Sequence, residues 1–175
     1  MKKLTLYLMP LLMAMMIVGC SSDDEDENYS FVPNILQIRD GENTDTKKYS
    51  VTNAYYLQED KNIIFRCDIN STYTDELFII IKRDSFDNIQ PGETFQLNQF
   101  YAHMISYAEN DGNSYYNVTK GIIKLVDRKR VGDKEVLSLQ INNLTIDNED
   151  STNEGHYIII NGLVDYGRAR LWVLF

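Results

Sequence analysis

The sequence has few of the residues and motifs that usually carry chemistry. Its 175 residues include only two histidines, two cysteines and three prolines. His103 and His156 stand in separate runs, without the HxH or HExxH spacing that is typical of zinc sites. The chain has no GxSxG nucleophile elbow, no phosphate-binding P-loop and no GxGxxG fingerprint. We therefore expect a protein that is not an enzyme and that carries no cofactor.

Basic residues are also scarce. Lysine and arginine together number 17 against 26 acidic residues, which gives a net charge of −9 at neutral pH. Such a chain has no general affinity for a phosphate backbone, so we expect no nucleic-acid partner. The one basic cluster, at 128–130, is flanked by Asp127 and Asp133, and we interpret it as a polar turn.

Only one long hydrophobic run is present, and it lies at the start of the chain. Lys2 and Lys3 precede an apolar stretch from Leu4 to Val18. As a helix this stretch would measure about 22 Å, whereas the hydrocarbon core of a bilayer is about 30 Å thick. A basic start, a short apolar middle and a small-residue end are typical of a secretory signal. A transmembrane anchor is the alternative, and the length disfavours it.

The end of this run, "IVGC" at 17–20, resembles the lipobox of bacterial lipoproteins. In that family the cysteine thiol receives diacylglycerol, with fatty chains such as palmitate, and the signal is cleaved directly before the cysteine. The resemblance implies that residues 1–19 are a cleaved signal peptide, with cleavage between Gly19 and Cys20. Cys20 would then carry the lipid, and two or more fatty chains anchor a protein stably in a membrane. Cys67 would be the only thiol left, so no disulfide could form within the chain.

The run "SSDDEDE" at 21–27 resembles the export signal of surface lipoproteins in the Bacteroides group, which is rich in acidic residues. The resemblance implies an outer-membrane lipoprotein that faces the cell exterior; a domain that faces the periplasm is the alternative. A block of like charges also repels itself and does not pack. We therefore expect residues 20–30 to form a lipidated cysteine with a disordered acidic tether.

Residues 31–175 have the pattern of a single all-β domain. Period-two alternation dominates, and its apolar positions are rich in Tyr, Ile, Val and Phe, which favour strands. We expect an antiparallel sandwich or a small barrel of about nine strands. Hairpin turns are predicted at 59–62, 109–113 and 128–134, and Pro91-Gly92 is a turn signal. A short helix is expected within residues 84–100.

The alternation also predicts which side chains face the core. Odd-numbered residues at 63–69 share one face, and the preceding run should place Tyr49, Val51, Tyr55 and Leu57 on one side. The run at 76–82 is apolar on both faces and indicates a central strand, or one covered on both sides. At 137–146 the apolar positions change from odd to even, so we predict a β-bulge near 142–143.

Three of the closing runs resemble those of small all-β lipoproteins of unknown function from the same bacterial group. In these proteins a glycine-led strand is followed by a strand with an Asn-Leu pair and by a strand like "INGxV". Gly121, Asn143-Leu144 and 160–162 fit this outline. The resemblance implies a fold class and no particular activity.

A few residues remain as candidates for a site. Cys67 alternates with core residues, which favours a buried, inert thiol over a nucleophile. The loop 147–155 is rich in oxygen ligands but lacks the EF-hand spacing, so Asp147, Glu149 and Asp150 are a weak calcium candidate beside a solvated hairpin tip. Exposed aromatic rings can bind sugars or proteins. Adjacent tyrosines must send one ring to each face of a strand, and the aromatic candidates are Tyr55, Tyr56, Tyr115, Tyr116 and Trp172.

Three functions from different classes fit these observations. The first is a non-enzymatic binding module, held to the membrane through Cys20 and contacting a glycan or a protein. The second is a structural subunit of a cell-surface assembly, joined through an edge strand. The third is a hydrolase with two catalytic carboxylates, which can lie far apart in the sequence and so leave no motif.

Overall fold

The computed structural model describes residues 31–41, 43–70, 74–105, 114–148 and 156–169. The predicted signal peptide, cleavage site and tether lie outside the described residues, as do Trp172 and the turn predicted at 109–113. A compact unit begins at Phe31.

This unit consists almost entirely of β-strands. The bounds of its elements, in chain order, are β1 Ile35–Asp40, β2 Thr46–Gln58, β3 Asn62–Asn70, β4 Thr74–Lys82, helix α2 Arg83–Asn88, β5 Thr94–Phe95, the 3₁₀ turn η1 Leu97–Gln99, β6 Phe100–Ile105, β7 Ser114–Val131, β8 Lys134–Asn148 and β9 Tyr157–Arg168. Within the described residues the prediction of an all-β antiparallel fold with about nine strands is therefore confirmed.

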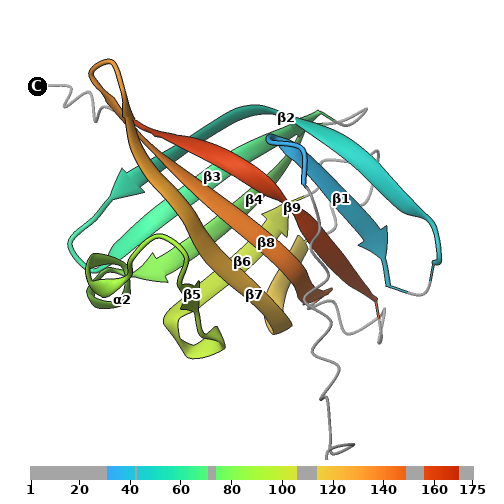
Figure 1. Cartoon of the computed structure of the whole chain (residues 1–175). Helices are drawn as coiled ribbons and strands as arrows, with labels where there is room; N and C mark the ends of the chain where they lie inside the picture. The colour runs from blue at the N-terminus through green and yellow to red at the C-terminus, as the bar shows by residue number, and fades with distance from the viewer. Residues whose placement is uncertain (1–30, 42, 71–73, 106–113, 149–155, 170–175) are drawn as a thin grey trace, which may run out of the picture. The chain divides into compact units, whose positions relative to one another are not determined.

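Eight of the nine described strands close into an up-and-down barrel (Figure 1). From β1 to β9 each strand of the ring pairs antiparallel with the next, and β4 pairs with β6 across the segment that holds α2 and β5. The ring closes because β9 also pairs antiparallel with β1. β5 is the extra strand, and it pairs with β7. Of the two expected architectures, sandwich and barrel, the structure shows the barrel.

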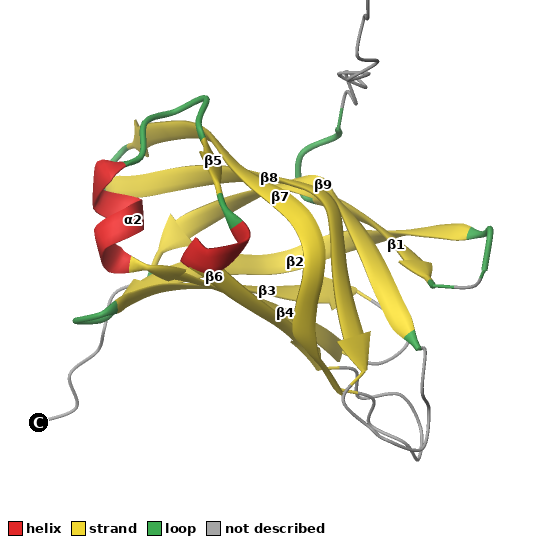
Figure 2. Cartoon of the chain, turned by 90° about the horizontal axis from the view of Figure 1, so that it is seen from below, coloured by secondary structure: helices red, strands yellow, loops and turns green. Residues whose placement is uncertain are grey.

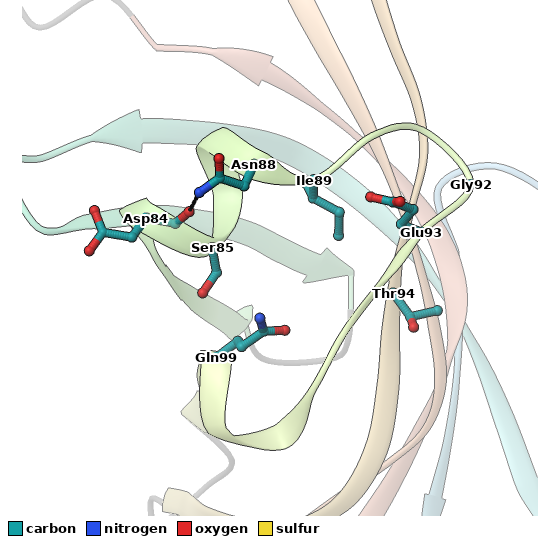
Figure 3. Close-up of a pocket in the computed structure, with 8 residues that line it drawn as sticks. All are labelled: Asp84, Ser85, Asn88, Ile89, Gly92, Glu93, Thr94 and Gln99. Atoms are coloured by element: carbon teal, nitrogen blue, oxygen red, sulfur yellow. Dashed lines mark hydrogen bonds between the residues drawn. The ribbon is translucent and has the colours of Figure 1, made fainter.

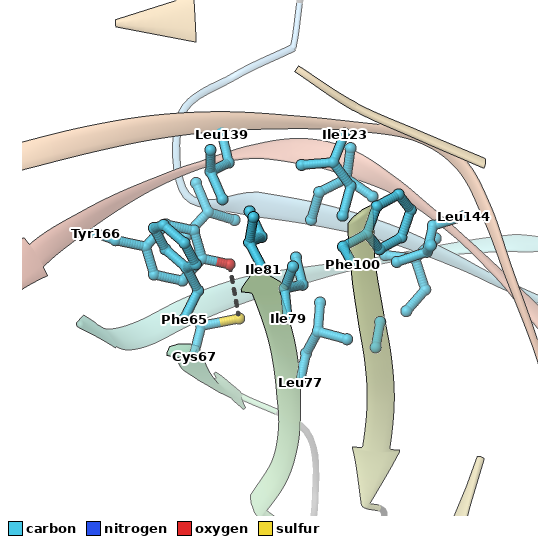
Figure 4. Packing of buried hydrophobic residues seen from close by; sticks show 14 of the residues in the cluster. Phe65, Cys67, Leu77, Ile79, Ile81, Phe100, Ile123, Leu139, Leu144 and Tyr166 are labelled. Carbon is cyan, nitrogen blue, oxygen red and sulfur yellow. Dashed lines mark hydrogen bonds between the residues drawn. The ribbon is translucent and has the colours of Figure 1, made fainter. Parts of the chain in front are cut away.

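The inner face of the barrel forms one hydrophobic core. On β3, for example, Ile63, Phe65 and Cys67 have no exposed surface, whereas Arg66 between them is half-buried on the outer face. The same alternation on the other strands brings side chains from opposite walls into contact (Figure 4). An eight-stranded barrel is about wide enough for side chains to fill its interior. Burial of this core is therefore the main source of stability.

Helix α2 closes one end of the barrel, as Figure 2 shows. The ring of Phe86 on this helix is 3% exposed and lies 6.0 Å from the ring of Phe65, centroid to centroid. Phe65 in turn packs against Tyr56 at 5.6 Å and Tyr166 at 5.1 Å. Aromatic rings thus fill the barrel interior beneath the helix. The short helix expected within 84–100 is confirmed, and η1 adds one more turn in that range.

The β-bulge predicted in β8 is confirmed. The register of β8 against β9 shifts between Ile141 and Leu144, and Asn143 adopts a left-handed conformation with φ of 48°. The side-chain oxygen of Asn161 accepts a hydrogen bond from the Asn143 amide at 2.7 Å, which satisfies a donor that the bulge removes from the ladder. Leu144 and Ile146 thereby return to the core.

Two glycines of the closing strands allow backbones to approach closely. A Cβ at Gly121 would lie 2.6 Å from the Cα of Leu144, and φ there is +127°. A Cβ at Gly162 would lie 2.6 Å from the carbonyl oxygen of Ile35 on β1. The three sequence features of the closing runs therefore have structural roles in the barrel wall. Gly121 packs on the bulge at Asn143-Leu144. Asn161, in the segment 160–162, accepts the hydrogen bond from the amide of that bulge.

One predicted face is wrong. Tyr49 and Val51 pack against the core as expected, but the register of β2 against β3 shifts between Val51 and Asn53. After this bulge Tyr56 is the buried residue, whereas Tyr55 and Leu57 lie half-buried on the outer face. The bulge exchanges the inner and outer positions for the rest of the strand.

The described turns agree with the prediction. The amide of Glu59 donates to the carbonyl of Asn62 at 2.9 Å and closes the β2–β3 hairpin. Gly132 and Asp133 join β7 to β8 within the predicted range 128–134, but the interpretation of the basic cluster at 128–130 as a turn is wrong, because these residues belong to the end of strand β7. Gly92 has φ of +97° in the Pro91-Gly92 turn. Neither helical turn in the described part of the chain is long and apolar enough to cross a membrane.

Candidate functional site

Five planar side chains form a continuous row on the outside of the barrel, one from each of five neighbouring strands. Tyr55 pairs with Arg66, Arg66 with Phe78, and Phe78 with His103. Tyr116 of β7 follows, because its neighbour Tyr115 pairs with Met104, which is next to His103. We call this set the aromatic row.

The members of the aromatic row are stacked on one another. The rings of Phe78 and His103 lie 4.4 Å apart with an interplanar angle of 16°, and those of His103 and Tyr116 lie 5.5 Å apart at 29°. The guanidinium carbon of Arg66 lies 5.7 Å from the ring centroid of Tyr55 and 5.6 Å from that of Phe78. The Arg66 cation therefore lies between two π faces.

Two carboxylates hold Arg66 in this position. Its Nη2 donates to Glu76 at 2.5 Å, and its Nε donates to Asp68 at 3.3 Å. All three side chains are partly buried, so these charge-assisted bonds are stronger than those of a fully exposed pair. The charge of Arg66 is thus matched within the wall, and the guanidinium contributes mainly its flat faces to the row.

Burial lowers the pKa of His103 below its ordinary value of 6.5. The imidazole is therefore neutral at pH 7 and stacks between Phe78 and Tyr116 as an uncharged ring. His103 therefore has a packing role in the row. His156 is exposed directly before β9.

A second row runs beside the first on the same outer face. Leu57 pairs with Ile64, Ile64 with Ile80, and Ile80 with Tyr101. The three aliphatic side chains are half-buried, and Tyr101 is 60% exposed. The ammonium of Lys82 lies 5.9 Å from the Tyr101 ring centroid. We call this set the aliphatic row, and the two rows together the outer face.

The two rows offer different chemistry to a ligand. In the aromatic row the π faces of the inner members are occupied by their neighbours, so these members present mainly their edges to solvent. In the aliphatic row Tyr101 is the most exposed aromatic of the outer face, and it stands at the end of a row of half-buried aliphatic side chains. Tyr101 is therefore the side chain best placed to enter a partner.

The structure separates the aromatic candidates of the sequence. Tyr55 and Tyr116 lie on the outer face, whereas Tyr56 is fully buried and Tyr115 is 9% exposed, both inside the barrel. Each adjacent pair thus sends one ring to each side of the wall, as predicted. The hydroxyl of Tyr56 donates to Glu135 at 2.7 Å, and its pKa is raised by burial and by this hydrogen bond. Trp172 lies outside the described residues.

Cys67 is fully buried, as expected. The hydroxyl of Tyr166 donates to its sulfur at 3.8 Å, and burial raises the pKa of the thiol to about 12. The thiolate is therefore strongly disfavoured near neutral pH, and a nucleophilic role has no support here.

The calcium candidate is not assembled in the described part of the chain. Asp147 lies at the end of β8, where one carboxylate oxygen accepts a hydrogen bond from Thr119 at 3.5 Å. Glu149 and Asp150 lie outside the described residues. Among the residues that the structure describes, no group of three or more His, Cys, Asp and Glu side chains could hold a metal ion.

An open pocket lies beside α2 at the closed end of the barrel (Figure 3). It has a volume of about 640 Å³. Its polar lining comes from α2, the strand β5 with the residue before it, and η1, and consists of Asp84, Ser85, Asn88, Glu93, Thr94 and Gln99. We call it the end pocket. It holds two carboxylates, but in Figure 3 that of Asp84 points away from Glu93, which is not the arrangement of a catalytic acid pair across a substrate.

Sequence reasoning did not single out Arg66, Phe78, Tyr101 and His103 as members of a binding surface. The alternation at 100–105 did contain a signal, because Phe100, Ala102 and Met104 are buried and leave Tyr101 and His103 on the outside.

Comparison with family models, curated proteins and solved structures finds no match to this chain.

Proposed function

We propose that this chain is an outer-membrane lipoprotein, held by fatty chains on Cys20 and facing the cell exterior, that acts as a non-enzymatic binding module. The lipobox at 17–20 and the acidic run after it support the anchor and its location. The outer face supports the binding role, because half-buried aromatic and aliphatic side chains lie next to one another across neighbouring strands, with Tyr101 and Tyr116 exposed beside them. This surface is the observation that carries the proposal.

The outer face favours a protein over a glycan as its ligand. Sugar rings bind to free aromatic faces, but the inner members of the aromatic row have theirs covered by stacking. The aliphatic row combines three half-buried aliphatic side chains with an exposed tyrosine, and apolar and aromatic residues of this kind are enriched in the cores of protein interfaces. A glycan bound against Tyr101 is the alternative.

The other two functions have less support. A subunit joined through an edge strand needs a long free edge, whereas the described strands of the barrel pair on both sides around a closed ring. The hydrolase needs two carboxylates that face one substrate, and the carboxylates of the end pocket do not have that arrangement.

Site-specific photo-crosslinking on intact cells tests the binding surface. A photoreactive amino acid replaces Tyr101 in one variant and Val131, which is 57% exposed at the β7–β8 hairpin, in a control. We expect a discrete adduct from position 101 that is absent from position 131 and is lost when Ile80→Asp is added. A protease-sensitive adduct identifies a protein, and a glycosidase-sensitive adduct identifies a glycan. No adduct, or the same adduct from both positions, would contradict the proposal.

A further inference from the structure

The end pocket is built from side chains that are held in place by hydrogen bonds. The amide of Gly92 donates to Leu125 at 2.6 Å, and the Leu125 amide donates to the carbonyl of Glu93 at 3.0 Å, so the turn is fixed to β7. One carboxylate oxygen of Glu93 accepts a hydrogen bond from the Gln90 amide at 2.8 Å. The wall that carries Glu93 is therefore ordered before any ligand binds.

The opposite walls are fixed in a similar way. The side-chain oxygen of Gln99 accepts a hydrogen bond from the Gln96 amide at 2.7 Å, within a reciprocal capping arrangement of η1. The side-chain nitrogen of Asn88 donates to the carbonyl of Asp84 at 2.7 Å. Figure 3 shows the hydroxyl of Ser85 and the amide of Gln99 directed toward the same space.

These internal bonds leave a defined set of donors and acceptors in the end pocket. Within the described residues, no further hydrogen bond engages the second carboxylate oxygen of Glu93, the amide nitrogen of Gln99 or the side-chain oxygen of Asn88. The hydroxyls of Ser85 and Thr94 can both donate and accept. Ile89, which is 7% exposed, supplies an apolar wall.

This set matches two classes of small ligand poorly. An anionic ligand would meet the carboxylates of Asp84 and Glu93, and no cationic side chain lines the pocket in the described residues. An amine would pair with the carboxylates, but it would leave the Gln99 amide nitrogen without an acceptor from the ligand. A neutral ligand with several hydroxyl groups fits the carboxylates and the Gln99 amide alike, because a hydroxyl group can donate a hydrogen bond to a carboxylate and accept one from an amide. The volume is also in the range of small-molecule sites.

We propose that the end pocket binds a neutral, hydroxyl-rich small molecule, that is, a monosaccharide or a similar polyol. Glu93 and Asn88 accept hydrogen bonds from its hydroxyl groups, and the Gln99 amide donates to them. Thr94 adds a further hydroxyl contact, and Ile89 packs against its carbon skeleton. This site is separate from the outer face, which lies on the wall formed by β2, β3, β4, β6 and β7.

Nuclear magnetic resonance titration of the full chain in detergent tests the end pocket. The probes are glucose, galactose, mannose and N-acetylglucosamine, with putrescine as a cationic probe and citrate as an anionic probe. We expect at least one sugar to shift the amide signals of Ser85, Glu93 and Gln99, with a Kd of about 1–10 mM. Putrescine and citrate should leave these signals unchanged.

Matched variants make the test specific. Thr94→Val keeps the shape of an exposed side chain but removes its hydroxyl, and we expect it to weaken sugar binding about fivefold. Glu93→Gln, which replaces an acceptor oxygen, should also weaken binding and serves if Thr94→Val does not fold. Asp87→Asn lies on α2 outside the pocket and should leave binding unchanged. The proposal is overturned if no sugar shifts these signals, if putrescine or citrate binds there instead, or if Asp87→Asn weakens binding as much as Thr94→Val.

Discussion

Single residues decide how closely the strands of the barrel approach. Gly121 has no room for a side chain, because a Cβ there would lie 2.6 Å from the backbone of Leu144. Its φ of +127° is also a conformation that other residues rarely adopt. The glycine of the lipoprotein-like outline is therefore required for the β7–β8 contact at the bulge.

We predict that Gly121→Ala lowers the free energy of unfolding by about 2–4 kcal/mol, from backbone strain and overpacking together. Denaturant unfolding measures this difference. Gly167→Ala is the matched control, because its Cβ would meet one atom at an ordinary 3.9 Å, and it should cost less than about 1 kcal/mol. Equal losses in the two variants would be inconsistent with the close approach at Gly121.

The buried thiol predicts a pH dependence of stability. Burial raises the pKa of Cys67 from its ordinary 9.0 to about 12, so the folded state holds the thiol proton more tightly than the unfolded state. This contribution is complete below pH 9.0 and is lost as the pH rises from 9.0 toward 12. The free energy of unfolding should therefore fall by up to about 1.4 kcal/mol per pH unit in that window.

Cys67→Ala separates this contribution from that of the buried tyrosines. The pKa values of Tyr56 and Tyr166 are also raised above their ordinary 10.0 by burial, and they add the same trend at higher pH. Denaturant unfolding between pH 9 and pH 10 should show a smaller slope for the variant than for the natural chain, even though the variant is less stable overall. An identical slope would refute the buried neutral thiol.

Among the elements, the strands β2, β3, β4, β6 and β7 are joined on the outer face by cross-strand side-chain pairs. Cross-strand pairs on one face of a sheet each contribute a fraction of a kcal/mol, and the aromatic row joins several of them in series. Arg66 has the most contacts in this row, since it lies between Tyr55 and Phe78 and binds Asp68 and Glu76.

We predict that Arg66→Met lowers the free energy of unfolding by about 1–2 kcal/mol, because it keeps the aliphatic stem but leaves two partly buried carboxylates without their partner. Thermal and denaturant unfolding measure the loss. Arg83→Met removes an exposed ion pair with Asp87 and an exposed hydrogen bond to the carbonyl of Glu59, and it should cost less than about 1 kcal/mol. A loss no larger at position 66 than at position 83 would show that the row does not stabilise the wall.

Two β-bulges show when the register of a strand can be predicted from its sequence and when it cannot. In β8 the apolar residues change from odd to even positions between Ile141 and Leu144, and this change predicted the bulge. In β2 the bulge lies before two adjacent tyrosines, and either of them could face the core. Because the pattern of β2 fits both registers, only packing against β3 and β9 selects Tyr56 as the buried one.

The candidate site was predictable only in part for a related reason. The rule that adjacent tyrosines face opposite ways correctly predicted one outer ring in each pair, but it did not say which ring, and the alternation of β2 placed Tyr55 on the wrong face. Which residues of other strands lie beside them depends on cross-strand register, and register does not follow from the pattern of a single strand. Phe78 and His103 therefore became part of the row only in the folded structure.

For the whole molecule, alternation predicted strands and their number but left sandwich and barrel equally open. Both architectures bury one face of each strand, so their sequences have the same period. The pairing of β9 with β1 closes the barrel, and it joins segments from the two ends of the domain. Such a contact has no local sequence signal.

We propose that fatty chains on Cys20 hold this protein at a membrane, and mass spectrometry of the protein purified from its native membrane tests this proposal most directly. We expect a chain that begins at Cys20, with the added mass of two or more fatty acyl chains on that residue. A chain that still carries residues 1–19 and a free thiol at Cys20 would contradict it.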